Sequence, residues 1–113
     1  MKKSMLICFV SLPVFFPVPA LAAGADCHQA KHADEKTLCA SRELSELDVE
    51  MRVKYHFLAG LAGMGVRGDM QDAQTAWLTQ RRQCGTDHRC LLTAYRQRIA
   101  ELDRLYDALQ KPL

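Results

Sequence analysis

The fold is decided by the segment SRELSELDVEMRVKYHFLAGL, residues 41–61. Its apolar side chains recur at steps of three and four residues, which is the spacing of one face of an α-helix. They are Leu44, Leu47, Met51, Tyr55, Leu58 and Leu61. The opposite face is charged, with Glu43, Glu46, Glu50 and Lys54. Ser41 stands before the first turn, where a hydroxyl caps a helix, so we expect one long amphipathic helix with its apolar stripe in a core.

One helix is expected before this segment and another near the end of the chain. Residues 33–40 predict a short helix, because Asp34 and Glu35 stand at its N-terminal end, where negative charge favours the helix dipole. The last helix is expected to follow the tight turn at residues 84–87 and to run to about residue 109, before Pro112. Its inner face carries Leu91, Ala94, Tyr95, Ile99, Leu102, Leu105, Tyr106 and Leu109.

A glycine-rich segment separates the long helix from the next one. Its glycines are Gly60, Gly63, Gly65 and Gly68. Each glycine in a helix interior costs about 1 kcal/mol relative to alanine, so we expect the segment to end the helix as a flexible loop. A third helix is then expected to begin at Asp69 or Asp72 and to run through Cys84, with Trp77 in the core.

No stretch alternates with period two, so the prediction is an all-α fold: a small antiparallel bundle of one short and three longer helices. We expect disulfides to cross-link this bundle, because an even number of cysteines in a small exported chain is typical of a disulfide framework. The cysteines are Cys27, Cys39, Cys84 and Cys90. Four cysteines allow three pairings. The local pairs, Cys27 with Cys39 and Cys84 with Cys90, close the shortest loops and are favoured by chain entropy.

The same cysteines also suggest an alternative, a metal site. Cys27, His28, His32 and Cys39 cluster near one end of the chain, and Cys84, His88 and Cys90 near the other. Neither spacing is that of a zinc finger, and thiols in an oxidising compartment are consumed as disulfides. We therefore expect no metal and no other cofactor.

The first residues predict export. Lys2 and Lys3 precede an apolar run at residues 5–18, and Ala20 and Ala22 form an A-x-A cleavage pattern. Residues 1–22 are expected to be a signal peptide and residues 23–113 one helical domain, with cleavage after residue 23 or 25 as alternatives. A membrane anchor is disfavoured because prolines interrupt an apolar stretch shorter than the roughly 20 residues of a spanning helix. The expected location is the bacterial periplasm or the medium, with no membrane attachment after cleavage.

The charge balance disfavours a nucleic-acid partner. The formal net charge of +2 comes from Lys2 and Lys3, so the predicted mature domain has equal numbers of acidic and basic side chains. Binding to nucleic acid or to an anionic membrane requires a basic patch, which this composition does not indicate.

The residues indicate binding to a protein and not catalysis. No serine, threonine or cysteine stands in a nucleophile motif. Arg67 lies between glycines and close to Met64, where a flexible loop would present a guanidinium to an acidic cleft of a partner. The turn that carries His88 and Arg89 is a second candidate surface.

Four short motifs resemble the LprI-like family, the lysozyme inhibitor LprI-like N-terminal domain. They read DCHQA at 26–30, EKTLC at 35–39, LSELD at 44–48 and WLTQRRQC at 77–84. Tyr55, Cys90, Tyr95, Arg98 and Leu102 agree as well. The resemblance implies a lysozyme inhibitor of the cell envelope whose partner is a lysozyme.

The alternative is a periplasmic interaction module without lysozyme activity, such as an immunity protein, an assembly factor or a chaperone-like protein. The sequence does not predict the oligomeric state.

Overall fold

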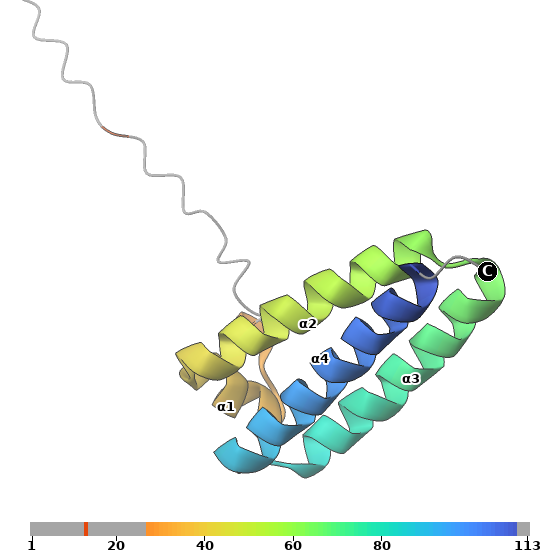
Figure 1. Cartoon of the computed structure of the whole chain (residues 1–113). Coiled ribbons are helices and arrows are strands. Elements are labelled where there is room, and N and C mark those ends of the chain that lie inside the picture. Colours follow the sequence, from red (N-terminus) through yellow and green to blue (C-terminus); the bar gives the residue numbers. More distant parts are fainter. Residues whose placement is uncertain (1–12, 14–26, 111–113) are drawn as a thin grey trace, which may run out of the picture.

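The computed structural model describes Pro13 and residues 27–110. After a 3₁₀ turn at Cys27–Gln29 come four helices: α1 (Ala33–Ala40), α2 (Arg42–Leu61), α3 (Met64–Gln83) and α4 (His88–Gln110) (Figure 1). The described part of the chain contains no strand. The expected all-α bundle of one short and three longer helices is confirmed, and α1 has the predicted bounds.

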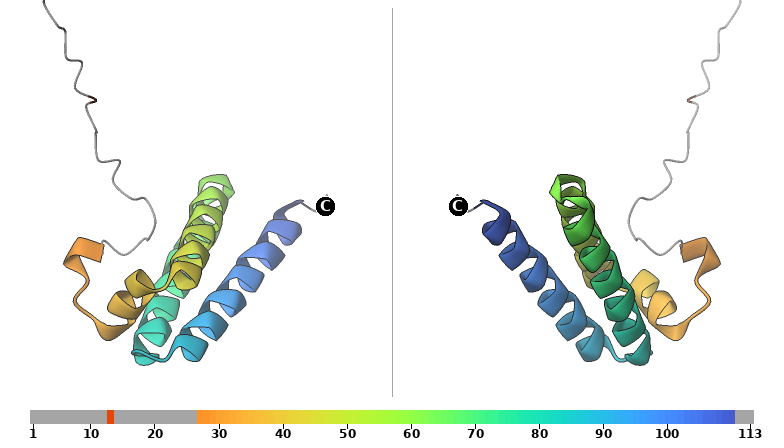
Figure 2. Two further views of the ribbon diagram at one scale, coloured as in Figure 1. Left: turned by 90° about the vertical axis from the view of Figure 1, so that its left-hand side faces the viewer. Right: turned by 90° about the vertical axis from the view of Figure 1, so that its right-hand side faces the viewer.

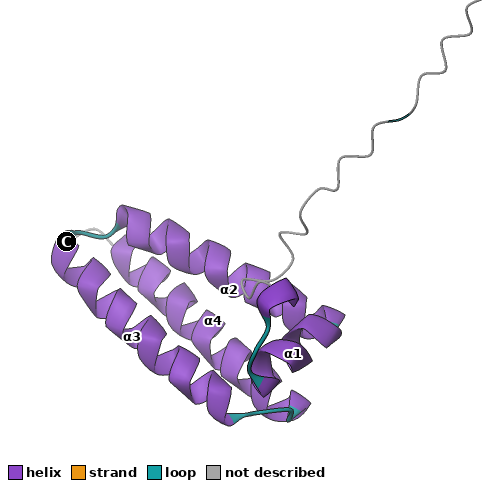
Figure 3. Cartoon of the chain, turned by 180° about the vertical axis from the view of Figure 1, so that it is seen from behind, coloured by secondary structure: helices purple, strands orange, loops and turns teal. Residues whose placement is uncertain are grey.

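The three long helices run antiparallel to their sequence neighbours. Figure 2 shows α2 and α3 as a layer with α4 on one side and α1 on the other. Seen from behind, in Figure 3, α1 lies at the end of the bundle where α2 begins and α3 ends, and it contacts both helices. We call this the cystine end, and we call the opposite end, where α2 turns into α3, the turn end.

The core is built from one stripe on each long helix. α2 contributes Leu44, Met51 and Leu58, spaced by seven residues, and α4 contributes Leu91, Tyr95 and Leu102. Trp77 of α3 is buried as predicted, and Leu38 of α1 fills the cystine end. Leu61, which the apolar stripe also predicted to be buried, is 55% exposed because α2 ends there.

The glycine segment differs from the prediction. α3 begins at Met64 and not at Asp69 or Asp72, so just two residues, 62 and 63, join it to α2. The Arg67 guanidinium donates hydrogen bonds from Nε to the carbonyl oxygen of Ala59 (2.9 Å) and from Nη2 to that of Ala62 (3.2 Å). It thereby satisfies carbonyl groups that are left free at the end of α2. These tertiary contacts outweigh the low helix propensity of glycine, and the flexible loop was a wrong prediction.

Alanine at Gly65 or Gly68 is therefore expected to stabilise the protein by up to about 1 kcal/mol each. A methyl group at either position would meet no atom within 4 Å. Urea unfolding of the single variants measures the gain. Gly85→Ala is the control and should lose stability, because Gly85 has a φ of 56° that disfavours side chains. A loss of stability at Gly65 or Gly68 would contradict the helical assignment.

Both disulfides follow the local pairing. Cys27–Cys39 ties the 3₁₀ turn to α1, and Cys84–Cys90 ties the end of α3 to the first turn of α4. Asp87 caps α4, since its Oδ1 accepts a hydrogen bond from the Cys90 amide at 3.1 Å.

The predicted signal peptide lies, apart from Pro13, outside the described residues, as do the predicted cleavage site and Pro112. Across residues 27–110, none of the helices combines the length and the apolar character needed to cross a membrane.

Candidate functional site

A buried polar network links all four helices near the cystine end. Arg81 of α3 donates a hydrogen bond from Nε to Asp34 Oδ2 of α1 (2.9 Å) and another from Nη1 to the Tyr95 hydroxyl of α4 (3.2 Å). The Tyr95 hydroxyl in turn donates to Asp48 Oδ1 of α2 at 2.7 Å. The side chains of both aspartates are 1% exposed and that of Arg81 is 8% exposed. The network thus replaces water around three buried charges.

Aromatic packing encloses this network. Burial, followed by the negative charge of Asp48, raises the pKa of Tyr95 far above its usual value, so the phenol stays protonated and donates to Asp48. Trp77 packs edge-on against Tyr95, with ring centroids 4.9 Å apart, and its indole Nε1 donates to the carbonyl oxygen of Ala94 at 3.0 Å. The Arg81 guanidinium lies 5.8 Å from the centre of the Trp77 ring, within cation–π range.

This buried network falls within the segment matched by a known family. The family model for the lysozyme inhibitor LprI matches residues 27–102, which is well over half of the chain. The chain belongs to the LprI family. The searches of curated proteins and of solved structures give no match. The matched segment contains both disulfides and every residue of the buried network.

Four of the residues that carried the resemblance to the LprI family prove to be scaffold residues. Asp48, Trp77, Arg81 and Tyr95 carried the resemblance, and all four are buried in or against the network. Buried side chains cannot contact a partner, so these motifs specify how the bundle is held together. A binding surface of the LprI chain has to be sought among its exposed residues.

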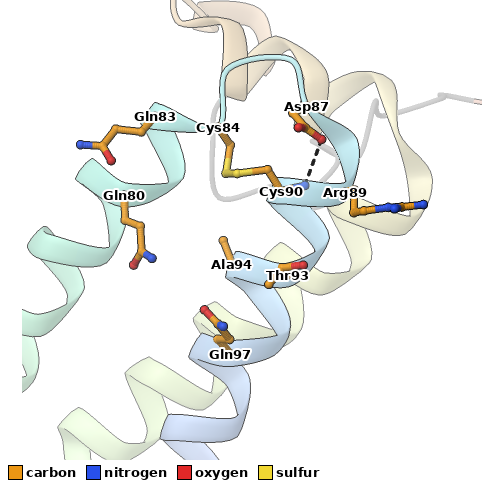
Figure 4. Close-up of a pocket in the computed structure, with 9 residues that line it drawn as sticks. All are labelled: Gln80, Gln83, Cys84, Asp87, Arg89, Cys90, Thr93, Ala94 and Gln97. Carbon is orange, nitrogen blue, oxygen red and sulfur yellow. Dashed lines mark hydrogen bonds between the residues drawn. A yellow bond between two sulfur atoms is a disulfide. The ribbon is translucent and has the colours of Figure 1, made fainter.

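One exposed hollow lies at the cystine end, between the end of α3 and the start of α4 (Figure 4). It has a volume of about 500 Å³, and we call it the cystine groove. The Cys84–Cys90 disulfide forms its closed end, and its polar side chains are mostly neutral: Gln80, Gln83, Thr93 and Gln97, with Asp87 and Arg89 at the rim. Amides and hydroxyls both donate and accept hydrogen bonds, so the groove can bind polypeptide or sugar groups.

The structure brings Arg89, but not His88, to the lining of this groove. Arg89 lines it and is exposed, and in Figure 4 its side chain extends away from α3. Among the residues that the structure describes, Arg89 has no hydrogen-bond or ion-pair partner. His88 is half exposed, with Nε2 3.5 Å from Glu43 Oε2 of α2. The turn that the sequence suggested as a contact surface is therefore accessible and held in place by the disulfide.

Arg67 and Met64 lie at the other end of the molecule. α3 has 20 residues, so its two ends are about 30 Å apart at 1.5 Å per residue. The sequence-predicted binding residues thus form two separate surfaces. The guanidinium of Arg67 donates to the carbonyl oxygens of Ala59 and Ala62, as described above, whereas Met64 is 89% exposed.

Within residues 27–110, no group of three or more His, Cys, Asp or Glu side chains is placed to hold a metal ion. All four cysteines of this range are in disulfides.

Sequence reasoning missed two features. It predicted that Asp34 interacts with the dipole at the start of a short helix, whereas the Asp34 carboxylate is the buried partner of Arg81. It also treated the outer side of α2 as uniformly charged, although Val53, Phe57 and Leu61 recur there at steps of four, a spacing that could have revealed them.

Proposed function

We propose that the chain is an exported envelope protein that inhibits a lysozyme by binding it, and that the cystine groove with Arg89 is the contact surface. The family match across the described bundle is the observation that carries this proposal. Lysozymes cleave their substrate with a pair of carboxylates at the scissile bond. A free guanidinium pairs strongly with such a group, and we assign this role to Arg89.

The rigidity of the groove supports the proposal. A disulfide joins its two walls, and the hydrogen bond from the Cys90 amide to Asp87 fixes the first turn of α4. Binding to a preformed surface loses less conformational entropy than binding that must first order a loop. Arg67 already bonds to its own chain, so we give it a positioning role at the end of α2 and not a contact.

The test is the clearance of a peptidoglycan suspension by c-type, g-type and phage lysozymes at micromolar concentrations of the oxidised protein. Inhibition of at least one class is expected. Unchanged rates with all three would eliminate the proposal. In that case a pull-down from periplasmic extract that yields an endogenous partner other than a muramidase would favour an interaction module.

Arg89→Glu is expected to weaken inhibition about 30-fold or more, the effect of losing a hot-spot contact of about 2 kcal/mol. The change reverses the charge that the proposal places against a carboxylate. Arg104→Glu is the matched control, because Arg104 is an exposed arginine of the same helix but lies far from the cystine groove. Inhibition constants for the two variants decide the matter. Equal constants would remove Arg89 from the contact surface.

Export is part of the same proposal. Cleavage after Ala22 and the presence of two disulfides are both read from the intact mass of the protein recovered from the periplasm, before and after thiol alkylation. A mass that retains residues 1–22 would contradict export with cleavage.

A further inference from the structure

An apolar surface lies toward the turn end, away from the cystine groove. We propose that a second copy of this chain binds there, to the face formed by the outer side of α2 and the end of α4. We call it the α2 face: it carries the exposed Val53, Phe57 and Leu61 of α2, and Tyr106 of α4, which lines the same groove as Phe57. This inference is independent of the proposed function.

The α2 face contains a ridge that the core does not use. Val53, Phe57 and Leu61 follow one another at steps of four along α2 and are 64%, 56% and 55% exposed. The core stripe of α2 lies on its other side, at Leu44, Met51 and Leu58. A surface helix normally buries its single apolar stripe and is polar elsewhere, so a second, exposed stripe indicates a surface that is covered by something else.

A groove runs beside this ridge. It has a volume of about 450 Å³ and lies between α2 and α4, with Leu58 and Leu102 among its lining residues. Phe57 and Tyr106 line it from the two helices, and their ring centroids are 6.3 Å apart. A ridge and a groove on the same face make that face self-complementary. Around a two-fold axis, the ridge of each copy can enter the groove of the other.

The charges at the edge of the groove also favour a second copy. Lys54 Nζ lies 2.7 Å from Asp103 Oδ1 and 3.0 Å from Glu50 Oε1, so these charges are already paired within one chain. Their hydrogen bonds, first that to Asp103, raise the pKa of Lys54 and keep it charged. A strongly charged partner would find little to pair with at this edge. Two copies would meet here without like-charge repulsion.

The apolar area of the face is compatible with the centre of a dimer interface. Four large apolar side chains that are 41–64% exposed together present on the order of 400 Å², which is within the range of the largest apolar patch on a typical monomer. A standard interface buries about 800 Å² per partner, including its polar rim. The apolar side chains of the α2 face would supply about half of such an interface, and the polar residues around them would supply the rest.

Sedimentation velocity of the oxidised protein over micromolar to submillimolar concentrations tests the inference. A reversible monomer–dimer equilibrium is expected, and Phe57→Lys should weaken it at least tenfold. Leu78→Lys is the matched control, because Leu78 is an exposed leucine, 38% accessible, on α3 and outside the α2 face. Hydrogen exchange of residues 53–61 should slow as the concentration rises, and circular dichroism checks that both variants remain folded.

Three results would overturn the inference. The first is a monomer at every concentration. The second is a dimer that Phe57→Lys leaves unchanged. The third is a monomer that co-sediments with phosphatidylcholine or phosphatidylglycerol vesicles through Phe57, which would make the face a lipid-binding surface. Loss of lysozyme inhibition without loss of the dimer, or the reverse, separates this inference from the proposed function.

Discussion

Replacing Arg81 with methionine is expected to lower the free energy of unfolding by about 3–5 kcal/mol, the cost of leaving buried charge without its partner. Methionine keeps much of the apolar volume of the arginine side chain but loses its charge, its hydrogen bonds and its cation–π contact with Trp77. Asp34 would lose the hydrogen bond from Arg81 Nε, and Tyr95 would lose the one from Nη1. Asp34 Oδ1 already has no hydrogen-bond partner within the described residues, which makes the loss at Oδ2 more costly.

Urea unfolding followed by circular dichroism measures this loss. Arg82→Met is the control: Arg82 is the next residue of α3 but is exposed, so its replacement should change stability little. Two equally mild effects would mean that the network does not hold the bundle together.

A double-mutant cycle tests whether Arg81 and Asp34 act as a pair. Asp34→Asn alone should lower the free energy of unfolding, because it leaves the buried charge of Arg81 without this partner. The same substitution should lower it less in the Arg81→Met variant, where that charge is already absent. Groups in one network usually show coupling energies of about 0.5–3 kcal/mol. Strictly additive effects would contradict the direct pairing.

The features that sequence reasoning predicted correctly are those with a local cause. Ser41 caps α2 through a hydrogen bond from the Leu44 amide to its hydroxyl at 3.3 Å, as the order of residues suggested. Periodicity located α2 and α4, but Tyr106 and Leu109, which were expected on the inner face of α4, are each 41% exposed near the end of that helix. The disulfide pairing followed from loop length alone, because the shorter loops lose less entropy on closing.

The features that it missed depend on contacts between distant segments. Helix propensity placed a loop at Gly65 and Gly68, but Arg67 reaches back to α2 and makes that segment helical. An acid in a short helix gives no sign of whether it faces water or a buried arginine 47 residues away, as Asp34 does. Such partners are fixed by the packing of α1 against α3, which a single sequence does not specify.

The same distinction separates the scaffold from the binding surface. Most of the described residues that carried the resemblance to the LprI family lie in the network, the core or the disulfides. These residues therefore predict how the chain folds and not what it contacts. Exposed residues such as Arg89 and Phe57 lie outside these constraints. Related chains with the same bundle could therefore differ in their partners.

Reducing both disulfides is expected to lower the free energy of unfolding by about 5 kcal/mol. The closed loops have sequence separations of 12 and 6, for which chain-entropy arguments give about 3 and about 2 kcal/mol. Small domains have total stabilities of about 5–15 kcal/mol, so the reduced protein should be largely or partly unfolded. Thermal unfolding by circular dichroism, with and without a phosphine reductant, measures the change.

Removing the disulfides one at a time separates stability from function. Cys27→Ala/Cys39→Ala and Cys84→Ala/Cys90→Ala should lose comparable stability, by the loop lengths above. Inhibition of lysozyme should fall mainly in the second variant, because Cys84–Cys90 joins the walls of the cystine groove, whereas Cys27–Cys39 ties down α1 and the turn before it. If inhibition fell equally in both variants at a temperature where both are folded, the contact surface would have to include α1.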